Sequence, residues 1–542
     1  MVTDARFLTF PAAPGRTRFS HLLRRLPLAL LALCLSACAT LQPPRPAPHS
    51  QTPAPAPATP LGRETTALHL PAAQSGFILL ASGADALATR LWLIDQARKS
   101  LDVQYYILRD DDTGKLFLDA LLRAAQRGVR VRLLLDDLNV GAQAPLFQTL
   151  ARAPNISVHF YNPLRFRSHS YLSLAYEYFT DGGKVDRRMH NKLLVADNEM
   201  AITGGRNIGD EYFQASSRLS FLDLDVLAAG PVVQQFAHSF DLYWNSVSAV
   251  PAAALPGWAQ TAQNLPALAR RLGAAAAAYQ ARAKGGTPQS NALVGELARG
   301  SAPWVAAPAV ALWDKPAKTR GDDNPAALLW GRFFALDIQP RKQLLLVSPY
   351  LVPGRTGMEW LRRMRSKGVS IAILTNSIAT NDVLISQAGY ERYRKAMLEA
   401  GIELHELKPA PDQTPLKHRL FGHGSSQASL HAKAYVIDDQ DVFIGSYNLD
   451  PRSALLNTEL GVLIESPALA RTVAQLIHAA MSPAFSYRLA LKPDVEGSGS
   501  HVVWITRDAA GAETTYEHPP HTGPLLQFGV SLLRLLPVQG QL

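Results

Sequence analysis

The stretch Met189-His-Asn-Lys-Leu-Leu-Val-Ala-Asp197 contains the pattern His-x-Lys-x4-Asp, which returns about 240 residues later as His431-Ala-Lys-Ala-Tyr-Val-Ile-Asp438. A turn of the form Gly-[Gly/Ser]-x-Asn follows each copy and ends at Asn207 and Asn448. One copy could arise by chance, but two copies in the same context are very unlikely to. The repeat supplies two imidazoles, two ammonium groups and two side-chain amides, a set suited to holding and breaking a phosphodiester.

The sequence before each motif also repeats, in the order strand, helix, glycine, strand. The first half has this series at Lys99–Tyr106, Gly114–Arg127 and Gly128–Leu135, and the second half at Lys342–Tyr350, Gly357–Lys367 and Gly368–Leu374. A strand–helix–strand unit implies parallel strands covered by helices. We therefore predict an α/β tandem duplication. Each half is a mixed, mostly parallel sheet flanked by helices, and the halves share one active site.

The predicted first domain covers residues 66–250 and the second covers residues 306–490. Residues 251–305 between them are rich in alanine and are predicted to form a helical linker, broken near Gly285-Gly286. Residues 491–542 form a C-terminal segment with an apolar run that begins at Leu525. We expect this run to pack in the core or between domains rather than in a membrane, because such stripes usually bury within their own protein.

Residues 1–38 have the composition of a secretory leader. Arg24-Arg25 precede the apolar run Leu26–Leu35, which is too short to span a bilayer. The run ends in Leu35-Ser-Ala-Cys38, which resembles the lipobox of bacterial lipoproteins and implies lipidation at Cys38. The alanine that follows implies the outer membrane in that class. An uncleaved inner-membrane anchor is the alternative. Residues 39–65, rich in proline and alanine, are predicted to form an extended tether.

Charge and cysteine content narrow the partners and the compartment. The chain of 542 residues has a formal charge of +10, and the leader carries five arginines and one aspartate, which leaves +6 for the remainder. That excess suits an anionic partner, either lipid headgroups or nucleic acid. Both cysteines lie in the leader, so the body has neither a disulfide framework nor a cysteine zinc site.

Side-chain alternation assigns faces within each motif. In an extended segment His190 and Lys192 share one face, as do His431 and Lys433. Asp197 and Asp438 are catalytic candidates as members of the motif, although each falls in the turn that follows. This position favours a structural role over direct catalysis.

A further strand after each motif carries an acid. The strands Asp223-Leu-Asp-Val-Leu227 and Glu459-Leu-Gly-Val-Leu463 align Asp223 with Glu459. A carboxylate that accepts a hydrogen bond from the far imidazole nitrogen would fix the tautomer and stabilise the charged ring. Asp225 is the weaker candidate for this role.

Both halves resemble the phospholipase D superfamily over roughly residues 65–540. The stretches Arg188–Lys192, Gly204–Tyr212, Gly445–Ser453 and Asn457–Leu460 are similar to those of the bacterial cardiolipin synthases called type C. Many cardiolipin synthases of other types have two N-terminal transmembrane helices, which this sequence does not show.

The resemblance implies a two-step phosphatidyl transfer in which His190 is the nucleophile and His431 the acid and base, although the near two-fold symmetry leaves this assignment open. It further implies that Lys192, Lys433, Asn207 and Asn448 clamp the non-bridging phosphate oxygens, without a metal or another cofactor.

The resemblance predicts an enzyme, a cardiolipin synthase that joins two phospholipids, phosphatidylglycerol with phosphatidylglycerol or phosphatidylethanolamine. A secreted phospholipase D or phosphodiesterase that uses water is the nearest alternative. A nuclease is less favoured, because a lipid anchor facing the periplasm places the enzyme beside lipid rather than nucleic acid. A non-catalytic lipid-binding scaffold is the third class. The aromatic residues Tyr171, Tyr176, Tyr178 and Phe179 form either an acyl-chain entrance or a packed loop. Donor, acceptor, oligomeric state and accessory proteins stay open.

Overall fold

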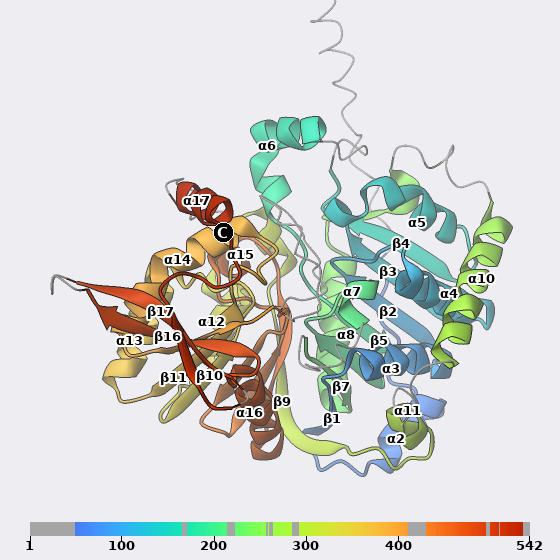
Figure 1. Cartoon of the computed structure of the whole chain (residues 1–542). Coiled ribbons are helices and arrows are strands. Elements are labelled where there is room, and N and C mark those ends of the chain that lie inside the picture. Colours follow the sequence, from blue (N-terminus) through green and yellow to red (C-terminus); the bar gives the residue numbers. More distant parts are fainter. Residues whose placement is uncertain are drawn as a thin grey trace, which may run out of the picture. The chain divides into compact units, whose positions relative to one another are not determined.

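The computed structural model describes residues 49–164, 171–213, 223–255, 258, 264–284, 292–409, 430–494, 499–508 and 510–534. Residues 46–542 form one compact unit, which contains both halves of the repeat. Figure 1 shows this unit as two sheets with helices packed against them. The predicted leader and the lipidation site Cys38 lie outside the described residues.

The first sheet has eight strands of its own, joined at one edge to a ninth, β9, that it shares with the second sheet. Its order is β9 (Val305–Trp313), β1 (Gln74–Leu80), β7 (Asp225–Ala229), β6 (Met200–Gly204), β5 (Leu193–Ala196), β2 (Ser100–Tyr105), β3 (Arg130–Asp136), β4 (Ile156–Tyr161) and β8 (Ala249–Pro251).

The second sheet repeats that order and adds two strands. It runs β9, β15 (Leu460–Glu465), β14 (Asp441–Gly445), β13 (Ala434–Ile437), β10 (Gln343–Val347), β11 (Ser370–Asn376), β12 (Glu403–Leu407), β16 (Ser486–Pro493), β17 (Ser500–Arg507) and β18 (Glu513–Tyr516). The tandem duplication is therefore confirmed strand by strand.

The sheets are mixed, as predicted, but the prediction that they are mostly parallel is wrong. Among the strands of the described residues, only β2–β3–β4 and β10–β11–β12 pair in parallel. Parallel pairing is imposed where a helix crosses over between strands, whereas each His-Lys-Asp motif lies on an antiparallel hairpin. The repeated strand–helix–strand pattern covers only strands joined by a crossover helix, and the motif strands have no such helix.

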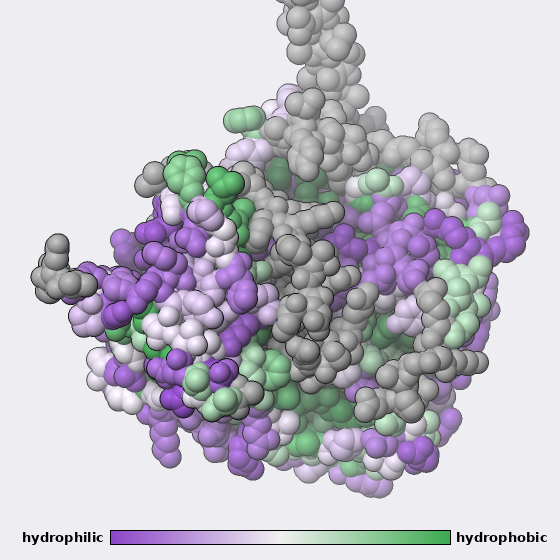
Figure 2. All heavy atoms as spheres, viewed as in Figure 1, coloured by the Kyte–Doolittle hydropathy of each residue, from purple (hydrophilic) through white to green (hydrophobic). Residues whose placement is uncertain are grey.

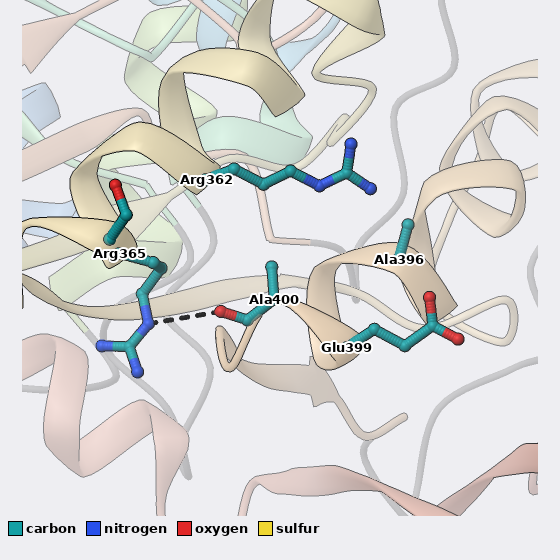
Figure 3. A pocket seen from close by; sticks show the side chains of 6 residues that line it. Arg362, Arg365, Ala396, Glu399 and Ala400 are labelled. Atoms are coloured by element: carbon teal, nitrogen blue, oxygen red, sulfur yellow. Dashed lines mark hydrogen bonds between the residues drawn. The ribbon is translucent and has the colours of Figure 1, made fainter.

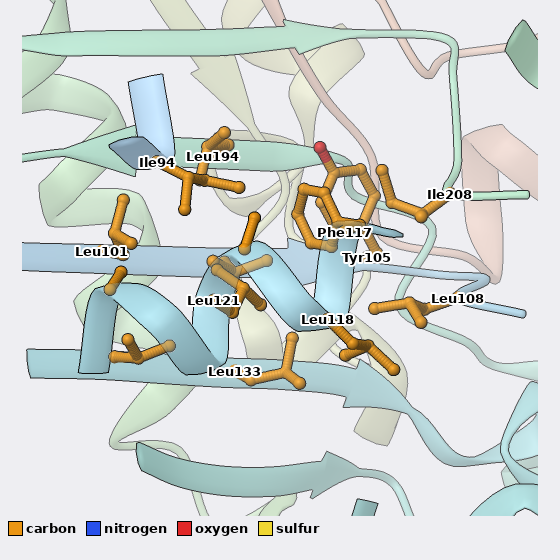
Figure 4. Close-up of a cluster of buried hydrophobic side chains, with 14 of the residues drawn as sticks. Ile94, Leu101, Tyr105, Leu108, Phe117, Leu118, Leu121, Leu133, Leu194 and Ile208 are labelled. Carbon is orange, nitrogen blue, oxygen red and sulfur yellow. The ribbon is translucent and has the colours of Figure 1, made fainter. Parts of the chain in front are cut away.

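Helices cover the outer face of the first sheet. These are α3 (Gly83–Gln96), α4 (Asp112–Gln126), α5 (Ala144–Leu150), α10 (Leu265–Lys284) and α11 (Ala292–Ala298). The α4 helix begins at Asp111, whose side chain accepts a hydrogen bond from the amide of Gly114. Its apolar face, with Leu118 and Leu121, packs on Leu133 of β3 (Figure 4). The helical linker predicted between the halves is present in α10 and α11, which pack on α4 and α3.

The remaining helices lie outside the group that covers the first sheet. They are α2 (Pro60–Ala67), α6 (Tyr171–Asp186), α7 (Asp210–Phe213), α8 (Pro231–Trp244), α12 (Leu329–Ala335), α13 (Gly354–Ser366), α14 (Leu384–Glu399), α15 (Pro451–Leu455), α16 (Pro467–Met481) and α17 (Pro524–Leu533). One hydrophobic cluster joins the halves, since it includes Val195 and Val226 of the first sheet and Val436 and Val462 of the second. None of the helices in the described ranges is long and apolar enough to cross a bilayer.

Two predicted boundaries need correction. The sequence predicts a free tether at residues 39–65, but the described part of this segment is bound to the rest of the protein. Thr52 donates its amide to both carboxylate oxygens of Asp241 and its hydroxyl to Asp102. Buried Arg132 binds both of these acids, and the carbonyl of Ser50. Residue 491 also falls inside β16, which pairs with β12, so the C-terminal segment is an extension of the second sheet.

Candidate active site

The two hairpins present their motif residues at one end and their turns at the other. His190 and Lys192 directly precede β5, and Asp197 follows it; His431, Lys433 and Asp438 stand in the same relation to β13. Seven residues of extended chain span roughly 20 Å. The spacing of the motif thus separates the aspartates from the histidines by the length of a strand.

Asp197 and Asp438 bind backbone at the far end of each hairpin. The Asp197 carboxylate accepts hydrogen bonds from the amides of Arg98, Lys99 and Ser100. Asp438 accepts the equivalent bonds from residues 341–343. Both aspartates have φ near +53°, the left-handed conformation that a short polar residue tolerates in a turn. Their place among the catalytic candidates is therefore corrected, because they fasten the hairpin turn to the start of the neighbouring strand.

The histidines pair with carboxylates of the opposite half. His190 Nδ1 lies 2.8 Å from Glu459 Oε2, and His431 Nδ1 lies 2.7 Å from Asp223 Oδ2. Glu459 is fully buried and Asp223 is almost so. Because each ring bonds its carboxylate through Nδ1, the Nε2 atoms are left for chemistry. The crossed pairing brings both histidines into one site, as the duplication predicted.

A short parallel bridge between the halves sets up the first pair. His190 donates its amide to the carbonyl of Thr458, and Thr458 donates its amide to the carbonyl of Arg188. The Arg188 guanidinium, with no exposed surface, binds both oxygens of Asp136 at the end of β3. Segment 188–190 is thereby held against residues 457–459, which places the His190 ring beside Glu459.

The carboxylates of Asp223 and Glu459 have different surroundings. One cause is the second residue of the Gly-[Gly/Ser]-x-Asn turns, which differs between the two halves. A Cβ on Gly205 would lie 1.9 Å from Asp223 Oδ1, so only glycine fits beside that aspartate. In the second half the same position is Ser446, whose hydroxyl donates to Glu459 Oε2 at 2.5 Å. Ser453 donates to the other oxygen at 2.8 Å. Glu459 is thus held by two hydroxyls in addition to the imidazole.

These surroundings move the two acids in opposite directions. Burial raises the pKa of Glu459 to about 7, although Lys192 and the serine hydroxyls oppose the shift. Burial would also raise the pKa of Asp223, but the charges of His431 and Lys433 outweigh it and hold that pKa well below its usual range. At neutral pH, Asp223 is therefore fully ionised and Glu459 is partly protonated.

The cations of the site disfavour one another. Burial, together with the charge of Lys433, lowers the pKa of His431 to about 4. Burial and the charges of Lys192 and Lys433 hold the pKa of His190 well below its usual value. Burial also lowers the pKa of Lys433 to about 8. Burial and mutual repulsion thus disfavour positive charge on these side chains, and an anionic phosphodiester would stabilise it.

The remaining predicted residues lie around this cluster. Lys192 Nζ donates to the carbonyl of His190 at 2.7 Å, and Lys433 Nζ donates to that of His431. Asn207 accepts from the amide of Ile107 and donates to the hydroxyl of Tyr212. Within the described residues, buried Asn448 Oδ1 has no hydrogen-bond partner. Asp225 binds Arg90 and Arg206 instead of an imidazole.

Other residues of the site were not assigned from the sequence. The Tyr106 ring meets His190 edge-on at 4.9 Å, and the Tyr212 ring meets His431 at 5.3 Å. Arg452 adds to the positive charge at His190. Tyr212 and Arg452 each lie five or fewer residues beyond a motif asparagine, which was the available signal. Tyr106 directly follows β2, and in the sequence it looks like an ordinary core residue of that strand.

A surface pocket of about 390 Å³ lies elsewhere, between α13 and α14 (Figure 3). It is lined by Arg362, Arg365, Ser366, Ala396, Glu399 and Ala400. None of these residues belongs to the histidine cluster. The pocket therefore has no part in the chemistry of the two motifs.

Comparisons with known proteins agree with this geometry. The family described as "Cardiolipin synthase, PLD-like domain" matches residues 91–244 and 338–481. Cardiolipin synthase C of Escherichia coli K12 is 40% identical over 471 residues, which cover 86% of this chain and 96% of the relative. Cardiolipin synthase A of Pseudomonas putida F1 is 25% identical over 71% of this chain and 64% of its own.

Among solved structures, the phosphatidylserine synthase of Haemophilus influenzae Rd KW20 covers 89% of this chain and 100% of its own, with a TM-score of 0.53 and 15% identity. That likeness concerns the fold. The family match extends over both halves and includes both motifs. The chain therefore belongs to the cardiolipin synthase family of phospholipase D-like proteins.

Proposed function

We propose that this protein is a phosphatidyl transferase that forms cardiolipin from two phospholipids, one of them phosphatidylglycerol and the other phosphatidylglycerol or phosphatidylethanolamine. The observation that carries the proposal is the pair of crossed contacts, His190 with Glu459 and His431 with Asp223. They leave two Nε2 atoms in one charged, largely buried site. This arrangement supplies a nucleophile and a proton carrier for one phosphodiester.

In the first step, His190 Nε2 attacks phosphorus and forms a P–N bond. The P–O bond to the leaving alcohol breaks, and the imidazolium of His431 gives its proton to the departing oxygen. In the second step neutral His431 takes the proton from the hydroxyl of the acceptor lipid. That oxygen attacks phosphorus, the P–N bond breaks, and His190 is released.

The unequal carboxylates support this division of roles. A general acid must be protonated when the substrate arrives, and ionised Asp223 favours the imidazolium of His431. A nucleophile must be neutral, and the partner of His190 is Glu459, whose pKa of about 7 weakens its pull on a ring proton. The bound phosphodiester then raises the low pKa of His431 toward neutrality.

Lys192 and Lys433 are proposed to hold the non-bridging oxygens, together with Asn207 and Asn448. Both ammonium groups are buried and directed to the backbone beside the histidines. Fixed positive charge at this place is most useful when the phosphorus gains its fifth oxygen or nitrogen ligand. These residues therefore stabilise the transition state more than the ground state.

Exposed apolar side chains on two helices support a membrane substrate. On α6, Phe179 is 86% exposed and Tyr176 is 53% exposed; on α17, Leu525 is 87% exposed and Phe528 is 70% exposed. Both helices lie on the same side of the molecule in Figure 1, and Figure 2 shows apolar atoms over them. The buried face of α17 packs on α14, while its outer face can meet acyl chains.

The proposal includes a lipid anchor at Cys38 and a place on the periplasm-facing side of the cell envelope, with the outer membrane favoured. The lipobox-like Leu35-Ser-Ala-Cys38 supports it. Labelling of expressing cells with radioactive palmitate, followed by membrane fractionation, tests the anchor. Unlabelled, soluble protein would reject it.

Thin-layer chromatography of lipids from expressing cells tests the function. Cardiolipin should rise with the wild type and with His238→Ala, a control at an exposed histidine of α8, and should not rise with His190→Ala or His431→Ala. A rise in phosphatidic acid in place of cardiolipin would show hydrolysis by a phospholipase D. Cleavage of plasmid DNA by wild type that His431→Ala abolishes would instead support a nuclease.

A further inference from the structure

A fully buried ion pair lies next to the site but outside both motifs. Asp314 directly follows β9, and Lys318 lies four residues later with its Nζ 2.9 Å from Asp314 Oδ2. Neither side chain has exposed surface. Burying two charges has a desolvation cost that their attraction often only balances, so fold stability alone gives little reason for this pair.

The pair holds Glu459 at both ends. Asp314 Oδ2 accepts the amide of Glu459 at 2.8 Å, which fixes the backbone of that residue. Lys318 Nζ donates to the carbonyl of Ser453 at 2.7 Å, and the hydroxyl of Ser453 donates to Glu459 Oε1 at 2.8 Å. Lys318 thus ties the backbone support of Glu459 to the support of its carboxylate.

The first half has a neutral residue in the equivalent place. Leu80 pairs with Asp225 as Leu312 pairs with Gly461, so the register places Ser82 where the second half has Asp314. Ser82 caps α3 through its hydroxyl and carries no charge. The supports of Asp223 and Glu459 therefore differ in kind.

We propose that Lys318, paired with Asp314, is a positioning residue that holds Glu459 as an oriented carboxylate acceptor for Nδ1 of His190. The inference rests on the proposed function, because His190 acts there as the nucleophile. Lys318 makes no contact with a motif lysine or histidine in the described structure, so it acts through Glu459. This role also gives a reason for a buried Asp314–Lys318 ion pair in the second half, despite its desolvation cost.

The charge of Lys318 matters as well as its hydrogen bonds. Burial raises the pKa of Glu459, and both Lys192 and Lys318 lower it. Other ionisable groups that interact with the Glu459 carboxylate include His190, Lys433, Asp450, Tyr435 and Tyr447, and Asp314 accepts the Glu459 amide. Without the positive charge of Lys318, the negative charges of Asp314 and Glu459 repel each other more strongly. The pKa of Glu459 therefore rises, and this residue keeps its proton to a higher pH.

The test is the pH dependence of turnover of phosphatidyl-p-nitrophenol in mixed micelles by the full-length protein. Lys318→Met should lower kcat at pH 7 several-fold, by less than about tenfold, with little change in KM, and should move the acidic limb of the profile to higher pH. Lys318→Arg should restore much of both, because it keeps the charge. Lys315→Met, at an exposed lysine three residues earlier, should match the wild type.

Two outcomes separate the hypotheses. If the wild type turns over no phospholipid, the proposed function fails; if it does and folded Lys318→Met has the wild-type kcat and profile, the positioning role is refuted. Should Lys318→Met not fold, Asp314→Asn/Lys318→Met removes both charges and keeps an acceptor for the amide of Glu459. Because that variant also lacks the Asp314 charge, it should lower kcat with little or no shift of the limb. A wild-type kcat in the double variant would overturn the proposal.

Discussion

The crossed contacts predict that the two carboxylates differ in importance, and Asp223→Asn is the sharpest test. The substitution keeps the size of the side chain but removes the charge that His431 Nδ1 meets at 2.7 Å. A hydrogen bond to a charged group contributes about 1.5–3 kcal/mol. At 1.36 kcal/mol per decade, this corresponds to roughly a ten- to 150-fold loss of kcat on a natural phospholipid.

Glu459→Gln should cost less, within about tenfold, because Glu459 is already partly protonated at neutral pH and the two serine hydroxyls can still hold an amide. The assay compares phosphatidylglycerol with phosphatidyl-p-nitrophenol. Nitrophenolate departs without a proton, so Asp223→Asn should form the phosphohistidine at a near-normal rate from that ester and release a burst of nitrophenolate.

The result that refutes the reasoning is specific. If Asp223→Asn loses as much on phosphatidyl-p-nitrophenol as on phosphatidylglycerol, with no burst, then His431 is not the acid of the first step. A burst that instead appears with Glu459→Gln would exchange the roles of the two histidines. Near-UV circular dichroism of both variants serves as the control for folding.

Three further predictions concern stability and membranes. Because the pKa of His431 falls to about 4 on folding, the unfolded state binds more protons than the folded state between about pH 6.5 and 4. The free energy of unfolding therefore decreases as the pH is lowered through this range. In thermal melts, the wild type should lose roughly 2 kcal/mol more stability than His431→Gln between pH 7 and 5. Arg132→Met breaks a buried network and should lower the unfolding free energy by about 3–5 kcal/mol in urea, whereas Arg130→Met, whose Nε and Nη2 have no hydrogen-bond partner in the described residues, should change little. Phe528→Ser should weaken flotation with phosphatidylglycerol vesicles, and the equally exposed Val247→Ser should not; equal effects would contradict a lipid-facing α17.

The sequence was sufficient for the features that depend on the repeat. Two copies of one motif predicted the duplication, and the strand–helix–strand series located β2, β3, β10 and β11. Period-two alternation placed His190 with Lys192. The turn acids Asp197 and Asp438 could be suspected of a structural role because their position in the hairpin follows from local geometry.

What the sequence could not give depends on contacts between distant residues. The partner of His190 is 269 residues away, and no local pattern distinguishes it from a partner in the same half. Lys318 and Asp314 lie in no recognisable sequence motif, because their proposed role depends on their contacts with Glu459 in the folded protein. The docking of Thr52 was hidden for a similar reason: a run of prolines and alanines has the composition of a free linker, whereas its fixation depends on Asp241 and Arg132.

The shared strand β9 limits how substrate can enter. Its first part pairs with β1 from Gln74 to Phe77, and its last part pairs with β15 from Leu460 to Ile464. A hinge motion that opened the halves would have to break the hydrogen bonds of one of these strand pairs, together with the crossed imidazole–carboxylate contacts. The two sheets therefore form one frame, and a phospholipid must reach the histidines without a hinge opening between the halves.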